Sequence, residues 1–447
     1  MSKSRTFTLF FGLFILCVSA QNPIIRNQFS ADPSARVFNN RVYLYPSHDI
    51  LASEGKGRKD WFCMEDYHVF SSDNLIDWTD HGMIVHQNKV PWVRPESYSM
   101  WAPDCIEKGG KYYFYFPSTV NDTLTNEKGF TIGVAIASSP TGPFIPEKMP
   151  IKGVKGIDPN VFIDKDGQAY LYWSQGNIYG AKLKDNMLEL DSEIKILGDL
   201  PSQGLKEGPY VFERNGIYYM TYPHVANKIE RLEYAISDNP LGPFKVAGVI
   251  MDESSTNCWT NHHSIIEFKN QWYLFYHHND YSPSFDKARS VRIDSLFFNS
   301  DGTIKKVIPT FRGVGITKAT TEIQIDRYSK KSDVGSNISF LDPKNTFKGW
   351  KTTLSSSNAW IEYDQVDFGK NKAKTCVVKA YSTTGGTLHI KSNTIDGALI
   401  TEVKIKAKPD WQEIEVPIIK QLTAIHDLFV TLKENDKNVE LDWIRFQ

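Results

Sequence analysis

Residues that could act on a substrate recur in this chain, each ahead of a segment rich in aromatic residues, and in all but one case they lie beside a proline or one residue away from it. Three of these places are Asp32-Pro33, Asp158-Pro159 and Glu207-Gly208-Pro209, and two further ones carry Pro103-Asp104 and His262-His263. Two carboxyl groups in one cleft can hydrolyse a glycosidic bond. One, protonated, donates to the leaving oxygen, and the other, ionised, acts on the opposite face of the sugar. Crowding of like charges keeps one of them protonated near neutral pH.

The segments that follow predict the strands that position these side chains. Short aromatic strands are expected at 42–45, 111–115, 169–172, 218–222 and 272–276. Hairpin turns such as Asn39-Asn40 and Asn215-Gly216 come just before them. One unit used about five times, with several strands in each copy, predicts a five-bladed β-propeller with blades that start near 32, 104, 158, 207 and 262.

Propeller geometry predicts that the repeated positions converge, because the innermost strand of every blade lines the central channel. We therefore expect one pocket, faced by Asp32, Asp104, Asp158, Glu207 and His262. The alternative for each acidic residue is a turn, since Asp or Glu before Pro is common there. Asp104 follows its proline, so it could instead cap a turn or support the site from outside. His262 could be a core histidine, and the sequence has no zinc motif, phosphate loop or nucleophile elbow.

Composition narrows the class of partner. The net charge of −1 over 447 residues argues against a nucleic-acid partner and against retention on an anionic membrane. Aromatic residues make up 13% of the chain, which suits stacking on sugars but also the filling of β-sheet cores. Trp101 illustrates both possibilities, as a wall of a sugar pocket or as a residue packed between blades. We expect a monomer.

The first twenty residues resemble a secretory leader. Lys3 and Arg5 precede an apolar run at 7–18, and small residues follow before Gln21. We predict removal of 1–20, a secreted or periplasmic product, and no membrane insertion afterwards.

Four scattered cysteines would remain, with no CxxC pair, so a zinc site is not expected. A disulfide and buried free thiols both stay open.

A composition change near residue 323 predicts a second domain. Repeats end there, lysine and serine become common, and short alternating strands follow to residue 447. About 120 residues of this kind suit a β-sandwich. The expected organisation is all-β, with a propeller at 21–320 and a sandwich at 321–447.

The ordered motifs of the first domain resemble glycoside hydrolase family 43, five-bladed propeller enzymes that act as α-L-arabinofuranosidases, β-xylosidases and arabinanases. The matching segments are Ala31-Asp32-Pro33, 43–49, Trp78-Thr79-Asp80-His81-Gly82, Trp101-Ala102-Pro103-Asp104, Ile157-Asp158-Pro159, Glu207-Gly208-Pro209 and Asn261-His262-His263-Ser264.

The resemblance implies an inverting hydrolysis that needs no cofactor. Asp32 would be the general base, Glu207 the general acid, and Asp158 the residue that orients the acid and adjusts its pKa. Arg289 would contact the sugar. His262 would hold a structural Ca²⁺ in the channel, usually through waters.

The second domain resembles carbohydrate-binding module family 6. The matching segments are 360–363, 366–369, 385–388, 411–412, 426–428 and 441–444. The family places an aromatic residue shortly before Trp360, but 353–357 offers none. Two roles stay open, sugar binding and bracing of the propeller.

The sequence therefore predicts a secreted exo-glycosidase that releases L-arabinofuranose, D-xylose or both from arabinoxylan-type plant cell-wall polysaccharides or their oligosaccharides. Three alternatives remain: an arabinan-degrading glycosidase, a retaining invertase-like propeller hydrolase, and a non-catalytic glycan-binding protein. The invertase-like motif has Asn before the aspartate, whereas this chain has Ala31.

Overall fold

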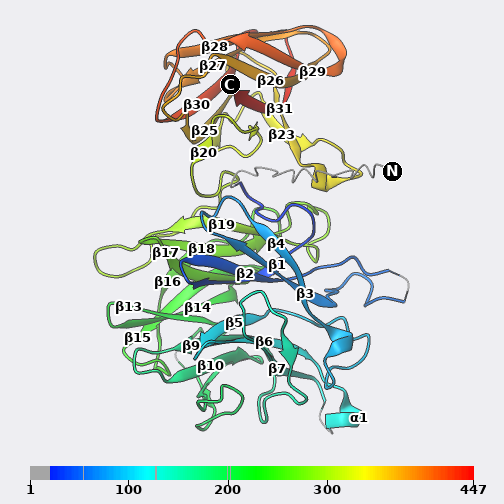
Figure 1. Ribbon diagram of the computed structural model, residues 1–447, viewed down its shortest axis with the longest axis vertical. Coiled ribbons are helices and arrows are strands. Elements are labelled where there is room, and N and C mark those ends of the chain that lie inside the picture. The colour runs from blue at the N-terminus through cyan, green and yellow to red at the C-terminus, as the bar shows by residue number, and fades with distance from the viewer. Residues whose placement is uncertain (1–20, 54, 126–127, 199, 202) are drawn as a thin grey trace, which may run out of the picture.

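The computed structural model describes residues 21–53, 55–125, 128–198, 200–201 and 203–447. They form two β-rich units, a larger one coloured blue to green and a smaller one coloured yellow to red (Figure 1). The predicted leader at 1–20 lies outside the described residues. No helix of the described part has the length and apolar character needed to cross a bilayer.

Five antiparallel sheets make up the larger unit, as far as the described residues show. In each sheet the neighbouring strands are consecutive in the chain. The sheets are β1 (Ala31–Phe38), β2 (Arg41–Ser47), β3 (Asp66–Ser72) and β4 (Thr79–His86); β5 (Asp104–Lys108), β6 (Lys111–Thr119), β7 (Phe130–Ala137) and β8 (Ile145–Pro146); β9 (Ile157–Ile163), β10 (Ala169–Ser174), β11 (Ile178–Lys182) and β12 (Lys195–Ile196); β13 (Tyr210–Arg214), β14 (Ile217–Val225), β15 (Glu230–Ser237) and β16 (Lys245–Met251); and β17 (His263–Phe268), β18 (Gln271–His278) and β19 (Ser290–Leu296). Short helices are η1 (Gln87–Lys89), α1 (Asp122–Thr125) and, in the smaller unit, η2 (Thr346–Lys348).

The first strands of the five sheets close a ring. β1 contacts β5, β5 contacts β9, β9 contacts β13, β13 contacts β17, and β17 returns to β1. This is the arrangement of a propeller in which each sheet is one blade, so the predicted fold class is confirmed.

The predicted aromatic strands are the second strands of the blades, and their turns have the expected conformation. Asn39 and Asn40 both have positive φ, 50° and 58°, as a type I′ turn requires. Rings from these strands fill the spaces between blades. Tyr45 on β2 packs with Phe114 on β6 in one such core, and both are fully buried.

The smaller unit is a sandwich of two sheets around one apolar core. β20 already belongs to it and pairs with β25, so the sandwich begins a few residues before position 321. One sheet holds β20 (Thr317–Lys318), β22 (Lys330–Lys331), β25 (Trp360–Asp367), β27 (Gly386–Ser392), β28 (Leu399–Ile405) and β30 (Ile425–Leu432), and the other holds β21 (Ile323–Gln324), β23 (Ser336–Phe340), β24 (Trp350–Leu354), β26 (Thr375–Ser382), β29 (Lys408–Pro417) and β31 (Val439–Phe446).

The segment just after the predicted leader joins the two units. The buried Gln21 side chain donates to the hydroxyl of Tyr363 in the sandwich at 2.6 Å. Asn22 donates to the carbonyl oxygen of Ile293 in the propeller at 3.0 Å, and its own carbonyl oxygen accepts from Arg327. These buried polar bonds support a bracing role for the sandwich.

All four cysteines of the described residues are buried free thiols: Cys63, Cys105, Cys258 and Cys376. Of the two states left open by the sequence, the structure has the reduced one.

Candidate active site

One pocket at the centre of the larger unit collects most of the predicted residues. It has about 600 Å³ of empty volume including its open mouth. Its lining residues are Asp32, Trp61, Phe62, Met64, Trp101, Ala102, Ile157, Asp158, Glu207, Pro223, Glu230, Trp259, Thr260, His262 and Arg289. Asp32, Asp158, Glu207, His262, Trp101 and Arg289 are thus brought together as predicted.

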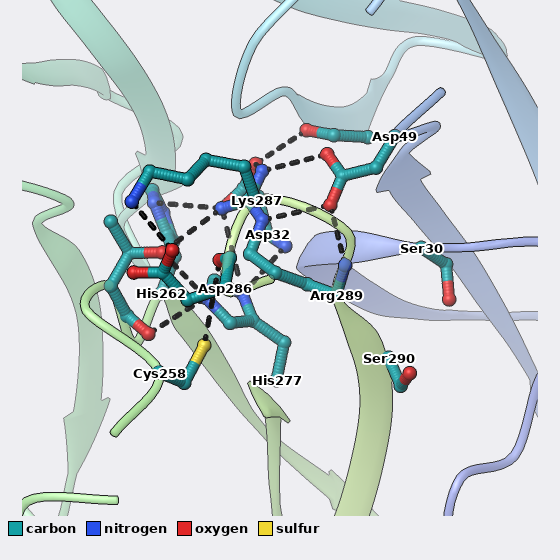
Figure 2. A network of polar contacts seen from close by, with 12 residues as sticks. Ser30, Asp32, Asp49, Cys258, His262, His277, Asp286, Lys287, Arg289 and Ser290 are labelled. Atoms are coloured by element: carbon teal, nitrogen blue, oxygen red, sulfur yellow. Dashed lines mark hydrogen bonds and ion pairs between the residues drawn. The ribbon is translucent and has the colours of Figure 1, made fainter. Parts of the chain in front are cut away.

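Asp32 is fixed by a guanidinium fork. Arg289 Nη1 and Nη2 donate to its two carboxylate oxygens at 2.9 and 3.2 Å, and Ser47 Oγ donates to Oδ2 at 2.6 Å. Figure 2 shows Arg289 between Asp32 and a second buried carboxylate, Asp49. Burial is the largest single effect and would raise the pKa of Asp32. The charge of Arg289, the neighbouring histidines and the Ser47 hydrogen bond together outweigh burial and lower this pKa to about 2. Asp32 is therefore ionised throughout the neutral range.

Arg289 has no N–H group left for a ligand. Nε and Nη2 donate to Asp49 at 2.9 Å each, Nη1 and Nη2 donate to Asp32, and Nη1 also donates to Thr260 Oγ1 at 3.2 Å. Five bonds use all five donors of a guanidinium. A sugar contact by Arg289, which the family resemblance implies, would require one of these bonds to be given up. Its visible role is to position Asp32.

We expect Arg289→Ala to lower the free energy of unfolding by about 3–5 kcal/mol, because it leaves two buried carboxylates without their counter-ion. Urea unfolding of the propeller transition measures this change. Lys306→Ala is the control, since its ion pair with Asp252 is exposed at 46% and 64% of the two side chains and should change stability by about 1 kcal/mol or less. Equal effects of the two substitutions would contradict the prediction.

Asp32 and Asp158 share an unusual backbone conformation. Their φ angles are 46° and 57°, in the left-handed region, and Gly208 has 53°. All three precede a proline. Aspartate tolerates this conformation better than most residues, yet it costs about 1–3 kcal/mol at a non-glycine position. The strained turn aims both carboxylates into the pocket.

The position of Glu207 corrects the predicted repeat. Gly208, not Glu207, is the counterpart of Asp32 and Asp158, and Glu207 precedes it by one residue. A side chain at Gly208 would approach His262 Cε1 to 3.0 Å and Pro223 Cδ to 3.1 Å. The blade therefore carries glycine at the repeated position, and the longer glutamate one residue earlier still lines the pocket.

Asp158 is tied to the backbone next to Glu207. Its Oδ2 accepts from the Gly208 N–H and from Ser174 Oγ, each at 3.1 Å. Burial is the main reason that its pKa rises to about 7, and the charges of Glu207 and Asp32 add to this rise. Asp158 therefore contacts the residue after Glu207 directly and affects Glu207 itself through charge.

Glu230 is a fourth carboxyl group in the pocket, which the sequence reasoning missed. It is 1% exposed, and its Oε2 accepts from the Asn261 N–H at 2.7 Å. Its Oε1 has no bond from an N–H or hydroxyl group of the described residues.

The neighbour of Glu230 is Glu207, and a hydrogen bond between two carboxyl groups requires a proton on one of them. Burial and then the charge of Glu230 raise the pKa of Glu207 well above its usual range, whereas the pKa of Glu230 is about 7. The pair therefore holds a proton in the neutral range, and the pKa of Glu207 is raised by both burial and its partner.

Glu230→Gln should move the alkaline limb of the kcat/KM–pH profile to lower pH. The substitution removes a negative charge that raises the pKa of Glu207, so Glu207 loses its proton earlier as the pH rises. Glu233→Gln is the control. Glu233 is also buried on β15, but it binds His224 and Arg231 instead of lining the pocket. An unchanged limb in Glu230→Gln would show that Glu230 does not set the proton affinity of Glu207.

Aromatic rings line the pocket beside the carboxylates. Trp101 is half-buried and its ring centre lies 4.6 Å from that of Phe130, so it is both a packed residue and a pocket wall. Trp61, Phe62 and Trp259 also line the pocket. They come from loops without a repeated pattern, and no signal in the sequence distinguishes them from core aromatics.

Asp104 corrects the prediction of a shared pocket. In the strand pairing, Asp104 lies opposite Tyr115, as Ser34 lies opposite Tyr45. Asp104 is therefore the counterpart of Ser34 and lies two positions beyond the counterpart of Asp32. It is absent from the pocket lining and forms a buried ion pair with Arg36. Its Oδ1 accepts from Ser34 Oγ at 2.7 Å. Asp104 therefore supports the channel from outside the site, which is the alternative stated above.

His262 lines both the pocket and a smaller channel cavity with about 200 Å³ of empty volume. Asp32 also lines both. Calcium takes six to eight oxygen ligands. The nearby carboxylates are already engaged, Asp32 by Arg289 and Asp104 by Arg36. This donor set does not fit a calcium ion caged by the protein. A calcium ion held by His262 through waters stays a prediction, and no chemical step is assigned to it.

Comparison with known proteins agrees with this site. The chain matches the profile of glycosyl hydrolases family 43 over residues 20–304 and that of carbohydrate binding module family 6 over 327–447. It is 35% identical to xylosidase/arabinosidase 43A of Humicola insolens over 63% of this chain and 98% of that protein. It is 28% identical to the arabinoxylan arabinofuranohydrolase of Bacillus subtilis (strain 168) over 92% and 89% of the two chains.

Solved structures resemble it as well. A family 43 β-xylosidase/α-arabinofuranosidase from a compost metagenome, in complex with xylotriose and calcium-free, has 35% identity and a TM-score of 0.56 over 65% of this chain and 98% of that one. The arabinoxylan arabinofuranohydrolase of Bacillus subtilis in complex with cellotetraose has 25% identity and a TM-score of 0.55 over 96% and 99%. The chain is therefore a glycoside hydrolase that belongs to family 43, with a C-terminal domain that matches the model of carbohydrate binding module family 6.

Proposed function

We propose that this enzyme is an inverting exo-glycosidase that releases D-xylose, L-arabinofuranose or both from arabinoxylan-type polysaccharides or their oligosaccharides. The observation that carries the proposal is the divergence of two carboxyl groups in one pocket. Asp32 is kept ionised by Arg289, whereas Glu207 is kept protonated by burial and by Glu230. Such divergence is typical of a base and an acid that act in the same reaction.

The reaction uses one water molecule. Asp32 accepts a proton from the water while the water oxygen forms a bond to the anomeric carbon. At the same time the bond from that carbon to the leaving oxygen breaks. Glu207 donates its proton to the leaving oxygen, so charge is conserved. The configuration inverts because the water attacks the face of the sugar opposite to the leaving group. Proton exchange with solvent then restores an ionised Asp32 and a protonated Glu207.

Asp158 positions the acid. Its bond to the Gly208 N–H fixes the backbone that carries Glu207, and its negative charge, when ionised, favours the protonated form of Glu207. Glu230 contributes to the same effect through its charge and its contact with Glu207. The aromatic residues of the pocket provide apolar faces for sugar rings.

The substrate class rests on the relatives and on the shape of the site. The relatives described above include a xylosidase/arabinosidase and an arabinoxylan arabinofuranohydrolase. A single pocket closed by aromatic and carboxyl side chains suits the end of a chain better than the middle of a long polymer, which supports exo action.

Hydrolysis of nitrophenyl β-D-xylopyranoside and α-L-arabinofuranoside, followed by product analysis on arabinoxylan, arabinan and xylo-oligosaccharides, tests the proposal. We expect single sugars from xylo-oligosaccharides or arabinoxylan. Release only from arabinan, or binding without turnover, would favour one of the alternatives. NMR of the first product separates inversion from the retention expected of an invertase-like enzyme.

We also propose export with cleavage before Gln21. The leader-like composition of 1–20 supports it, as does the buried place of Gln21 and Asn22 at the joint between the two units. Amino-terminal sequencing of the protein from the culture medium or periplasm tests this. A product that retains residues 1–20, or one that stays in the cytoplasm, would contradict it.

A further inference from the structure

Two histidines and an aspartate gather on the first blade outside the pocket. His48 follows β2, and Asp66 and His68 lie two residues apart on β3, so their side chains leave the same face. One potential ligand atom from each lies within 4.8 Å of the others, and this is the one such group of three or more found among the described residues. All three are half-buried, and none lines the pocket.

The geometry of the two imidazoles suits a shared metal ion. Two imidazoles bound to one tetrahedral zinc at about 2.0–2.1 Å have ring centres roughly 5 Å apart and steeply inclined rings. The rings of His48 and His68 have centres 5.3 Å apart and an interplanar angle of 64°. His48 Nδ1 and Asp66 Oδ1 are 2.6 Å apart. A small increase in this separation would let both atoms bind the same ion.

A further carboxylate orients one of the imidazoles. Asp80 Oδ1 lies 3.2 Å from His68 Nδ1 and is itself held by the Gly82 N–H at 2.7 Å. Metal-bound histidines commonly donate their other nitrogen to a carboxylate, which sets the tautomer. The contact with Asp80 makes Nε2 of His68 the nitrogen that can bind a metal.

We propose that His48, Asp66 and His68 form a site for a divalent transition metal of the Zn²⁺ class. Two imidazoles with one carboxylate suit zinc and its neighbours, whereas Ca²⁺ and Mg²⁺ require oxygen ligands. The half-buried position leaves room for water as a fourth ligand, as in zinc sites with three protein ligands.

The site has a direct structural connection to the catalytic base. In the chain, His48 lies between Ser47 and Asp49. Ser47 donates a hydrogen bond to Asp32, and Asp49 accepts one from Arg289. A metal on His48 would therefore fix the segment that holds both groups. The alternative is a metal-free ion pair between His48 and Asp66, for which the same 2.6 Å contact suffices.

Equilibrium dialysis of the chelator-treated full-length protein against Zn²⁺, with Co²⁺ as a spectroscopic probe, tests the site. We expect one bound equivalent that requires this group, with intense visible absorption from Co²⁺ in a four-coordinate site. His68→Gln should abolish this equivalent, and Asp80→Asn should weaken it about 10–100-fold, as is typical of such supporting carboxylates. Circular dichroism confirms that each variant is folded.

Two controls locate the ion. His86→Gln removes a histidine of the neighbouring strand β4 that is outside the group, and it should leave binding unchanged. His262→Ala should also leave it unchanged. Loss of the bound equivalent in His262→Ala, retention in folded His68→Gln, or no zinc binding by the wild type would each overturn the proposal. The readout is binding, so it does not depend on the substrate assigned to the pocket.

Discussion

Asp32→Asn should lower kcat on every glycoside substrate by roughly 10²–10⁴-fold, the usual contribution of a general base. The substitution keeps the shape of the side chain but removes the proton acceptor for the attacking water. Its effect should be the same for good and poor leaving groups, because attack by water is needed in both cases. Initial rates on nitrophenyl xyloside and on xylotriose measure it.

Asp49→Asn is the matched control. Asp49 is buried and shares the guanidinium of Arg289 with Asp32, but it does not line the pocket. Its substitution disturbs the same ion-pair network without removing the base, so the loss of activity should be clearly smaller. Equal losses in the two variants would mean that Asp32 acts only through the network.

Glu207→Gln should have an effect that depends on the leaving group. Xylotriose has an alcohol as leaving group, which needs a proton, and kcat should fall about 10²–10⁴-fold. A dinitrophenyl glycoside leaves as a stable anion, so its hydrolysis should fall much less. Because the general acid is removed, the alkaline limb of the pH profile should also disappear on the activated substrate.

The comparison between these two variants is the decisive measurement. Asp32→Asn should affect both substrates alike, whereas Glu207→Gln should separate them. A loss in Glu207→Gln that is equally large on both substrates would contradict its role as the acid. Unchanged rates in both variants would contradict the assignment of the site.

The strands and the pocket could be predicted because their signals are local. Alternation of residues along a strand, turn residues such as Asn39-Asn40, and an acidic residue beside a proline act over a few positions. They place Asp32 and Asp158 correctly. The same reasoning misplaced Asp104, since a shift of two positions along the strand moves a side chain out of the pocket while the motif still appears similar.

The sequence by itself determined the repeated unit, the propeller, and the places of Asp32 and Asp158 at the starts of their blades. Only the tertiary structure decided how each carboxylate is charged. Arg289 meets Asp32 across 257 positions of the chain, and Glu230 meets Glu207 after the chain has passed through two strands. The pKa of a buried carboxyl depends on the groups within a few ångströms of it. Closure of the ring of blades brings Arg289 to Asp32, and pairing of strands within one blade brings Glu230 to Glu207. No local pattern of residues contains either contact.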